Sequence, residues 1–338
     1  MDTKKTKDII LKRLYEIAMK EGIHSNMLKN AFYNLEPIAE EEGIDKETLQ
    51  GVYEELCRDG YLEYLMNWKA VRPSSKALTY CEQNGLVDSK FVDRQKEVRI
   101  GILEALFDLE EANPRPESIF GIWESQICEK ANIKELEFNN NIDLLDCWGL
   151  VKGHGLWNEW NLTTNGKEKV REYRRMRRFD ELKKSVNPQQ RGHKFEDLLE
   201  EVIKEEGWET WKRIRPEGAE IDILFKNNFN FFVASCKWEK KKVGGETLDA
   251  LIGRATELNC VACILISMSG FTSECIKRAE KSSQVVLFGP GDIEKVFRVE
   301  IFQSKKLFSE LLDEKIKERK VSGKILIDGK TFKSVLKE

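Results

Sequence analysis

The stretch PEGAEIDILFKNNFNFFVASCKW constrains the fold more than any other part of this sequence. It contains two apolar runs, Ile221–Phe225 and Asn230–Trp238, which are rich in the β-branched and aromatic residues that favour strands. Between them lies an asparagine pair of the kind found in tight turns. We therefore predict an antiparallel hairpin that turns at Asn227–Asn228 and has one face against a core.

The hairpin places its polar residues together. With the predicted turn, Glu220 lies opposite Ser235 and Asp222 lies opposite Val233. Because side chains alternate between the faces of a strand, Glu220, Asp222, Ser235 and Lys237 share one face. Charges beside a buried sheet are costly unless they are paired or bind something. The other face holds the residues predicted to meet the core: Ile221, Ile223, Phe232, Ala234 and Cys236.

Carboxylates beside a lysine suit one type of chemistry in particular. Carboxylate oxygens bind Mg²⁺, which retains several of its waters. The metal lowers the pKa of a bound water, and a neighbouring ammonium stabilises negative charge that develops on a phosphoryl group. The pattern therefore favours phosphodiester hydrolysis. The alternative is a half-exposed ion pair between Asp222 and Lys237 without functional consequence.

Length and composition describe an ordinary soluble protein. The 338 residues are 41% hydrophobic and 34% charged, which predicts two or three globular domains. The longest apolar runs are too short to span a membrane. The first residues lack the apolar core of a signal peptide, so we expect a cytoplasmic location. The eight cysteines are scattered and histidines number three, which favours buried thiols over a zinc site.

Basic residues form two local clusters, although the net charge of the chain is −3. One cluster lies in the predicted helix 166–184, and the other closely follows the second strand of the hairpin. Any contact with DNA must come from such clusters. For the helix, the alternative is a solvated surface. The predicted DNA-binding residues are Arg174, Arg175, Arg177, Arg178, Lys240, Lys241 and Lys242.

The first half of the chain shows the same order of elements twice. Residues 1–92 and 93–184 each read as a helix, a helix-turn-helix and a β-hairpin, and the second unit continues into the basic helix. This order predicts two mainly α winged-helix units. The first unit has an acid-rich helix in DKETLQGVYEELCRDG (45–60), which favours a packing or dimerisation role. The second offers Asn139, Asn140, Asn141, Lys152 and His154 for DNA contact.

Composition changes after the polar linker SVNPQQRG. An amphipathic helix, strands and then β–α–β alternation predict an α/β domain at residues 191–300. Residues 301–338 form an extension, predicted to hold a charged helix and a hairpin around Asp328–Gly329.

Several landmarks follow one another in the α/β region: GHKFEDLLEE, EGAEIDILF, FFVASCKW and SGFT. In this order they resemble the nuclease domain of Mrr-like type IV restriction endonucleases, in the PD-(D/E)xK superfamily, over about residues 191–298. The resemblance implies a mixed central sheet flanked by helices, and Mg²⁺- or Mn²⁺-dependent cleavage of double-stranded DNA in restriction of foreign DNA. It leaves a homodimer open. By position, Glu196 is the helix acid, Asp222 the metal ligand and Lys237 the motif lysine.

Ser235 departs from the family pattern, which has Glu or Gln two residues before the lysine. A serine hydroxyl adds no charge to a metal site, so lower metal affinity is expected. Glu220 could supply the missing carboxylate as a second metal ligand, and Glu239 or Glu246 could do so from nearby. The alternative is a catalytically weak or inactive nuclease fold that still binds DNA and acts as a regulator.

Overall fold

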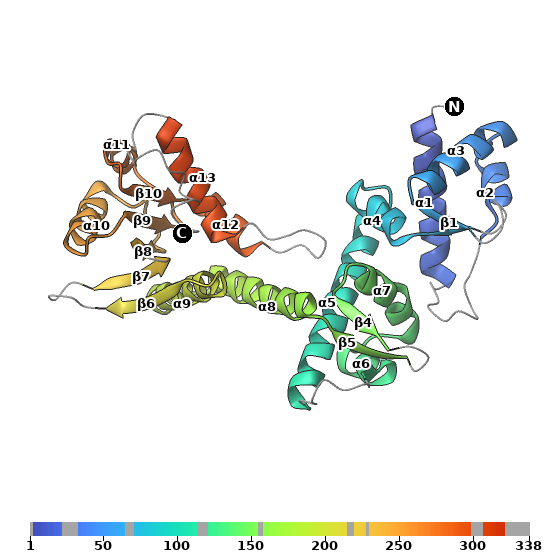
Figure 1. Ribbon diagram of the computed structural model, residues 1–338, viewed down its shortest axis with the longest axis horizontal. Coiled ribbons are helices and arrows are strands. Elements are labelled where there is room, and N and C mark those ends of the chain that lie inside the picture. Colours follow the sequence, from blue (N-terminus) through green and yellow to red (C-terminus); the bar gives the residue numbers. More distant parts are fainter. Residues whose placement is uncertain are drawn as a thin grey trace. The chain divides into compact units, whose positions relative to one another are not determined.

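The computed structural model describes residues 3–21, 33–64, 71–113, 121–154, 158–214, 220–227, 230–298 and 307–321. The chain divides into two compact units, Met1–Arg171 and Glu172–Glu338 (Figure 1). Helix α8 (Thr164–Lys184) contains the boundary between them. Among the described helices, none combines the length and the apolar character needed to cross a membrane.

The first unit begins with three helices and a small antiparallel sheet, as the sequence predicts. Asp45 caps the third helix, since its Oδ1 accepts a hydrogen bond of 2.9 Å from the Thr48 amide. A fourth helix follows the sheet. These elements are α1 (Thr3–Glu21), α2 (Leu35–Glu41), α3 (Lys46–Arg58), β1 (Leu62–Tyr64), β2 (Val71–Pro73) and α4 (Ser75–Gln83).

The same unit continues with a second set of helices and a three-stranded antiparallel sheet in the order β3-β5-β4. The order of helix, helix-turn-helix and hairpin is therefore present twice in this unit. The elements are α5 (Ser89–Ala112), β3 (Ile122–Trp123), α6 (Glu124–Ala131), α7 (Glu135–Cys147), β4 (Val151–Gly153) and β5 (Glu159–Leu162).

Two asparagines of α7 serve the packing of this unit. Asn140 is 4% exposed and donates to the carbonyl of Met19 at 2.8 Å, and Asn141 is fully buried. The amide of Asn141 donates to Gln95 of α5 at 2.7 Å. Both side chains satisfy buried polar groups, so the expectation that they contact DNA is wrong.

A buried ion pair joins α4 and α5. Arg99 and Glu82 have side chains that are 0% and 2% exposed, with Nη2 and Oε1 2.8 Å apart. The Tyr15 hydroxyl of α1 donates to the same carboxylate at 2.9 Å. Burial, and then the charge of Glu82, raises the pKa of Tyr15. The phenol therefore stays neutral and ties three helices to one carboxylate.

The second unit is built on a five-stranded mixed sheet in the order β10-β9-β8-β7-β6. The β6–β7 and β7–β8 pairs are antiparallel, whereas β8–β9 and β9–β10 are parallel. The predicted mixed sheet flanked by helices is confirmed. Its elements are α9 (Pro188–Glu205), β6 (Glu209–Ile214), β7 (Ile221–Asn227), β8 (Asn230–Lys237), α10 (Gly245–Glu257), β9 (Ala262–Ser267), α11 (Ser273–Lys281), β10 (Val285–Phe288), α12 (Pro290–Phe297) and α13 (Phe308–Val321).

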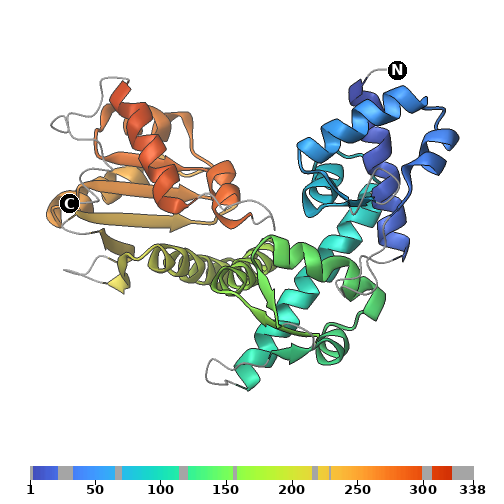
Figure 2. The same ribbon diagram turned by 45° about the vertical axis from the view of Figure 1, so that its right-hand side comes forward.

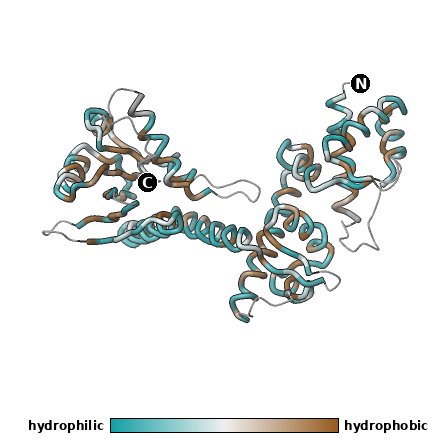
Figure 3. The backbone as a smooth tube through the Cα atoms, viewed as in Figure 1, coloured by the Kyte–Doolittle hydropathy of each residue, from teal (hydrophilic) through white to brown (hydrophobic). Residues whose placement is uncertain are grey.

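Separate apolar clusters cover the two faces of this sheet. Residues of α8, α9, α12 and α13 pack on one face, and α10 and α11 pack on the other. Figure 2 shows α13, in red, lying across the strands. Figure 3 shows the strands as mainly hydrophobic and α8 as mainly hydrophilic along its length. The site-bearing strand β8 lies in the middle of the sheet, so its position is fixed from both sides.

Helix α13 belongs to the core of the second unit, although the sequence places it in an extension of unknown role. Phe308 is fully buried, with its ring 5.1 Å from that of Phe288 and 6.0 Å from that of Phe225. The Glu206 carboxylate accepts hydrogen bonds from the amides of Phe308 and Ser309 at 2.6 and 2.9 Å. The predicted hairpin around Asp328–Gly329 lies outside the described residues.

Candidate active site

The observed register of β7 and β8 differs from the predicted one. Leu224 pairs with Val233, and Asn227 pairs with Asn230. Continuing this register places Asp222 across from Ser235. The predicted pairing of Ser235 with Glu220 is therefore wrong. The difference of two positions preserves the alternation of faces, which is why the predicted grouping of Asp222, Ser235 and Lys237 persists.

The Asp222 carboxylate lies where β7 and β8 stop pairing through their backbones. The pairs run from Asn227–Asn230 to Ile223–Ala234. Beyond them, Oδ2 of Asp222 accepts hydrogen bonds from the Cys236 amide at 2.6 Å and the Ser235 hydroxyl at 3.0 Å. Nζ of Lys237 lies 3.5 Å from the same oxygen. A side chain thus replaces the backbone acceptor and brings three predicted site residues together.

Asp222 and Ser235 are buried, whereas Lys237 is partly exposed. Asp222 is 9% exposed and Ser235 is 4% exposed. The Lys237 side chain is 31% exposed, which makes it the most exposed of the three. The carboxylate is largely shielded from water, whereas the lysine is partly open to solvent.

Arg213 interrupts the alternation of β6 beside Asp222. Its φ of 51° lies in the left-handed region, which is unfavourable for residues with a side chain. Lys212 and Arg213 therefore both contact α9: Nζ of Lys212 lies 2.8 Å from Asp197 Oδ1, and Nε of Arg213 lies 3.0 Å from Glu196 Oε2. Ile214 then faces the other side of the sheet.

The reversal extends to the neighbouring strand. Ile221, the partner of Ile214, packs in the cluster that contains Val233 and Leu248, and not in the cluster that contains Ile223. The prediction that Ile221 and Ile223 share a core face is therefore wrong. Simple alternation fails because Arg213 changes the direction of side chains at this end of β6.

Glu196 is buried near the cluster, and its own partners are Arg213 and His193. It is 8% exposed, and its Oε2 lies 3.0 Å from Nε of Arg213 and 3.5 Å from Nδ1 of His193. Burial, followed by the charges of Asp222 and Glu196, raises the pKa of the Cys236 thiol well above its usual value. Both carboxylates therefore act on the same end of β8, and Cys236 is a protonated structural thiol.

The donor set suits a metal whose coordination is completed by other groups. Across the described parts of the chain, no three His, Cys, Asp or Glu side chains form a cluster that could hold a metal. Mg²⁺, however, commonly takes one or two protein carboxylates and fills its shell with water and phosphate oxygens. Asp222 and the Ser235 hydroxyl fit that limited role.

Further carboxylates lie around this cluster. Despite burial, the hydrogen bond from Arg213 to Glu196, followed by the charges of Asp197, Glu196 and Glu220, raises the Arg213 pKa. The charge of Glu220 therefore acts on Arg213. Glu220 does not lie across from Ser235, because the register places Asp222 there. Glu239 and Glu246 are both exposed.

The predicted DNA-binding residues fall into two groups. Arg175 is 2% exposed and pairs with Glu205 at 2.5 Å, and Arg178 pairs with Glu201 at 2.5 Å. These two arginines hold α8 against α9, and Arg175 is too deeply buried to meet a phosphate. Arg174 is half-buried and Arg177 is exposed, whereas the run Lys240–Lys242, just beyond the end of β8, is exposed throughout.

The second unit is an α/β domain with a mixed sheet, helices on both faces, and Asp222 and Lys237 at one end of its central strands. Residues 189–296 match the family Mrr_cat, described as restriction endonuclease. This match confirms the resemblance predicted at about residues 191–298. Residues 189–296 are therefore similar to a restriction endonuclease domain family.

Other comparisons add little. A crystal structure described as a protein of unknown function, AF1548, has 17% identity and a TM-score of 0.28. The similarity covers 36% of this chain and 66% of that one, which is just under two thirds of its length. A TM-score this low supports no statement about fold or function. The search of curated proteins gave no match.

Sequence reasoning missed Arg213 and His193. Alternation along a strand predicts that Lys212 and Arg213 face opposite sides, so nothing in the sequence indicated that both contact α9. Helix α9 supplies their acidic partners in Glu196 and Asp197, which are adjacent in sequence. The left-handed backbone that makes this geometry possible has no signature in the residue type.

The backbone at Arg213 generates a stability prediction. Arg213→Gly and Arg213→Ala both remove the ion pairs, but glycine tolerates the left-handed conformation. We expect the Gly variant to have a free energy of unfolding higher than the Ala variant by about 1 kcal/mol. The matched pair at Lys212 should show the opposite order, because glycine destabilises ordinary strand positions by roughly 0.5–1 kcal/mol. Urea unfolding measures both differences, and the same order at both positions would contradict the account.

Proposed function

We propose that this chain is a divalent-metal-dependent endonuclease that hydrolyses phosphodiester bonds in double-stranded DNA. One observation carries the proposal: the Asp222 carboxylate, the Ser235 hydroxyl and the Lys237 ammonium converge at one end of β8. This cluster belongs to a domain that matches the restriction endonuclease family. Restriction of foreign DNA is the biological role that this family supports.

Asp222 is the proposed principal metal ligand. The Cys236 amide and the Ser235 hydroxyl fix its Oδ2, which limits the reorganisation needed at the site. Mg²⁺ or Mn²⁺ held here would supply a bound water of lowered pKa and neutralise phosphate charge. Glu196 and Glu220 are the candidates for a second carboxylate, and both now interact with Arg213.

Lys237 is the proposed partner of the phosphoryl group. Its Nζ is close to Asp222 and its side chain is partly open to solvent, so it can orient an attacking water and stabilise negative charge that develops on phosphate oxygens. Its strand pairs with β7 on one side and β9 on the other, which restricts its movement. A rigid strand is suited to holding a charged group at a defined distance from a reacting phosphate.

We further propose that the two sets of elements in the first unit are winged-helix units. The repeated order of helix, helix-turn-helix and hairpin supports this interpretation. Their α3 and α7 helices are poor candidates for phosphate contact, because both carry more acidic than basic residues. The main DNA contacts are therefore assigned to the second unit, above all to Lys240–Lys242.

A second function follows from Ser235. The hydroxyl occupies the position where the resemblance calls for Glu or Gln, and it donates a hydrogen bond to Asp222 Oδ2. It thus contributes no negative charge to a metal. A catalytically weak or inactive nuclease fold that binds DNA in a regulatory role is the alternative supported by this one contact.

Removal of either charged residue should stop cleavage. Asp222→Asn deletes the proposed ligand charge, and Lys237→Met deletes the ammonium while keeping much of the side-chain length. We expect each to lower metal-dependent nicking of supercoiled plasmid by at least about 100-fold. Lys281→Met, an exposed lysine that precedes β10 at the other end of the sheet, is the matched control and should stay within a few-fold of wild type. EDTA should abolish the wild-type reaction. Absence of wild-type cleavage with both Mg²⁺ and Mn²⁺ would support the regulatory alternative, and cleavage by both variants would contradict the assigned site.

Ser235→Glu tests the departure from the family pattern. The added carboxylate faces Asp222, so the site should bind Mg²⁺ more tightly and reach half-maximal cleavage at lower Mg²⁺ concentration. A shift of about tenfold corresponds to roughly 1.4 kcal/mol. Ser235→Gln, which adds similar bulk without charge, is the control. An equal shift in both variants would show that charge at this position is not what limits metal affinity.

Salt dependence tests the proposed phosphate contacts. Replacement of Lys240, Lys241 and Lys242 by alanine should reduce the slope of log affinity against log salt by about 0.9 for each phosphate that the protein no longer neutralises. Arg175→Met should leave the slope unchanged and lower the free energy of unfolding, because that arginine is buried against Glu205. Titration of fluorescent duplex DNA at several salt concentrations measures the slopes. A smaller slope for Arg175→Met than for the lysine variant would reverse the assignment.

A further inference from the structure

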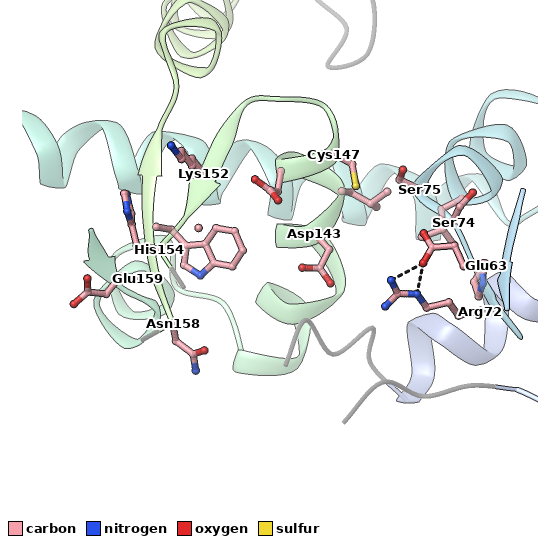
Figure 4. Close-up of a pocket in the computed structure, with 16 residues that line it drawn as sticks. Glu63, Arg72, Ser74, Ser75, Asp143, Cys147, Lys152, His154, Asn158 and Glu159 are labelled. Atoms are coloured by element: carbon pink, nitrogen blue, oxygen red, sulfur yellow. Dashed lines mark hydrogen bonds and ion pairs between the residues drawn. The ribbon is translucent and has the colours of Figure 1, made fainter. Parts of the chain in front are cut away.

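The first unit contains a polar cleft that the nuclease function does not use. It has a volume of about 500 Å³, within the range of roughly 300–1,000 Å³ that is typical of small-molecule sites. The β1–β2 hairpin and the start of α4 form one wall, and α7 with the β4–β5 hairpin forms the other (Figure 4). All of its lining residues lie within Met1–Arg171.

The electrostatic character of this unit disfavours an anionic ligand. Residues 1–171 contain 31 acidic and 23 basic residues, a net charge of −8, whereas residues 172–338 contain 28 and 33, a net charge of +5. Helix α7, which lines the cleft, has the sequence ELEFNNNIDLLDC, with four carboxylates and no lysine or arginine. A phosphate brought to this helix would meet like charges.

Several charged groups of the cleft are already engaged. Arg72 donates from Nε to Glu63 Oε2 at 2.6 Å, so this guanidinium and carboxylate largely neutralise each other. Glu159 is 4% exposed and accepts a hydrogen bond from the Gly121 amide at 2.9 Å. The His154 ring lies 2.8 Å from the Asn161 amide. Lys152 remains as an exposed cation of the β4 wall.

Asp143 and Asp146 are the acidic groups of α7 in the cleft. Figure 4 shows Asp143 between the β4–β5 hairpin and the Glu63–Arg72 pair. Within the described residues, no donor makes a hydrogen bond to its carboxylate. Burial, partly offset by Arg72, raises the pKa of Asp143 to about 7, and burial also raises that of Asp146. A half-buried carboxyl without a hydrogen-bond donor is stabilised in its charged form by a ligand that brings a positive charge.

We propose that this cleft binds an organic cation, an ammonium or guanidinium group, with Asp143 as its main acceptor and Asp146 as the second. Trp160, which is 8% exposed, also lines this space, and an aromatic ring is favourable beside such cations. The group can come from a free amine or from a basic side chain of a protein partner. The site is separate from Asp222 and Lys237 and does not depend on the proposed nuclease activity.

Calorimetry of the full chain at pH 7 tests the proposal with defined probes. Putrescine represents a free amine. Nα-acetyl-lysine amide, which keeps its side-chain ammonium, represents a basic side chain. The uncharged analogue of putrescine is 1,4-butanediol. At least one ammonium probe should bind and the diol should not. Whichever ammonium probe binds more tightly identifies the source. Binding should also release up to about half a proton, because a carboxyl with a pKa of about 7 is then half protonated and becomes ionised. The dependence of the binding enthalpy on the buffer measures this release.

Matched variants of α7 complete the experiment. Asp143→Asn keeps the shape of the side chain, and it should weaken binding at least about tenfold and abolish proton release. Glu135→Gln, an exposed acid of the same helix that does not line the cleft, should leave both unchanged. Thermal unfolding checks that both variants are folded. The proposal is overturned if wild type binds neither ammonium probe at millimolar concentration, if the diol binds equally well, or if Asp143→Asn binds like wild type.

Discussion

The candidate site depends on the two hydrogen bonds that the Asp222 carboxylate accepts from β8. At this point β7 and β8 cease to pair through their backbones, and the carboxylate takes the Cys236 amide and the Ser235 hydroxyl. A buried carboxylate is costly unless it is fully paired. The arrangement keeps a negative charge next to Lys237 in a largely dry environment. A divalent metal needs such a fixed negative charge, whereas an anionic phosphate is stabilised by a cation such as the neighbouring ammonium.

The rest of the second unit supports this strand end. Helices α9 and α13 pack on one face of the sheet, and the Glu206 carboxylate caps α13 from a distant part of the chain. The end of α8 joins the same core, where the rings of Phe179 and Phe297 stack at 4.4 Å. Basic residues of α8 are therefore partly structural. The helix uses its apolar stripe for packing and Arg175 for a buried ion pair.

Local patterns in the sequence predicted what depends on local physics. Alternation along two strands was sufficient to group Asp222, Ser235 and Lys237, because a shift of register by two positions leaves the faces unchanged. Hydrophobic periodicity and capping residues such as Asp45 also predicted the order of helices and strands in the two compact units of the chain. Landmarks spread over the α/β region were sufficient to identify the family.

Features that depend on distant partners or on backbone conformation were not predictable. The sequence predicted that Arg175 contacts DNA, but in the structure it pairs with Glu205. It also placed Phe308 in a C-terminal extension, whereas the ring packs against Phe225 and Phe288 in the core. The left-handed φ of Arg213 reverses the side chains of β6 and moves Ile221 to the other core. The residue types at these positions do not indicate the distant partners or the backbone conformation.

Paramagnetic broadening by Mn²⁺ tests most directly whether the end of β8 is a metal site. In amide spectra of the isotope-labelled full chain, substoichiometric Mn²⁺ should broaden the signals of Asp222, Ser235 and Lys237 first. The same addition to Asp222→Asn should leave these signals sharp. Broadening centred elsewhere in the chain, or unchanged broadening of β8 in the Asp222→Asn variant, would contradict the assignment of Asp222 as the metal ligand of a nuclease site.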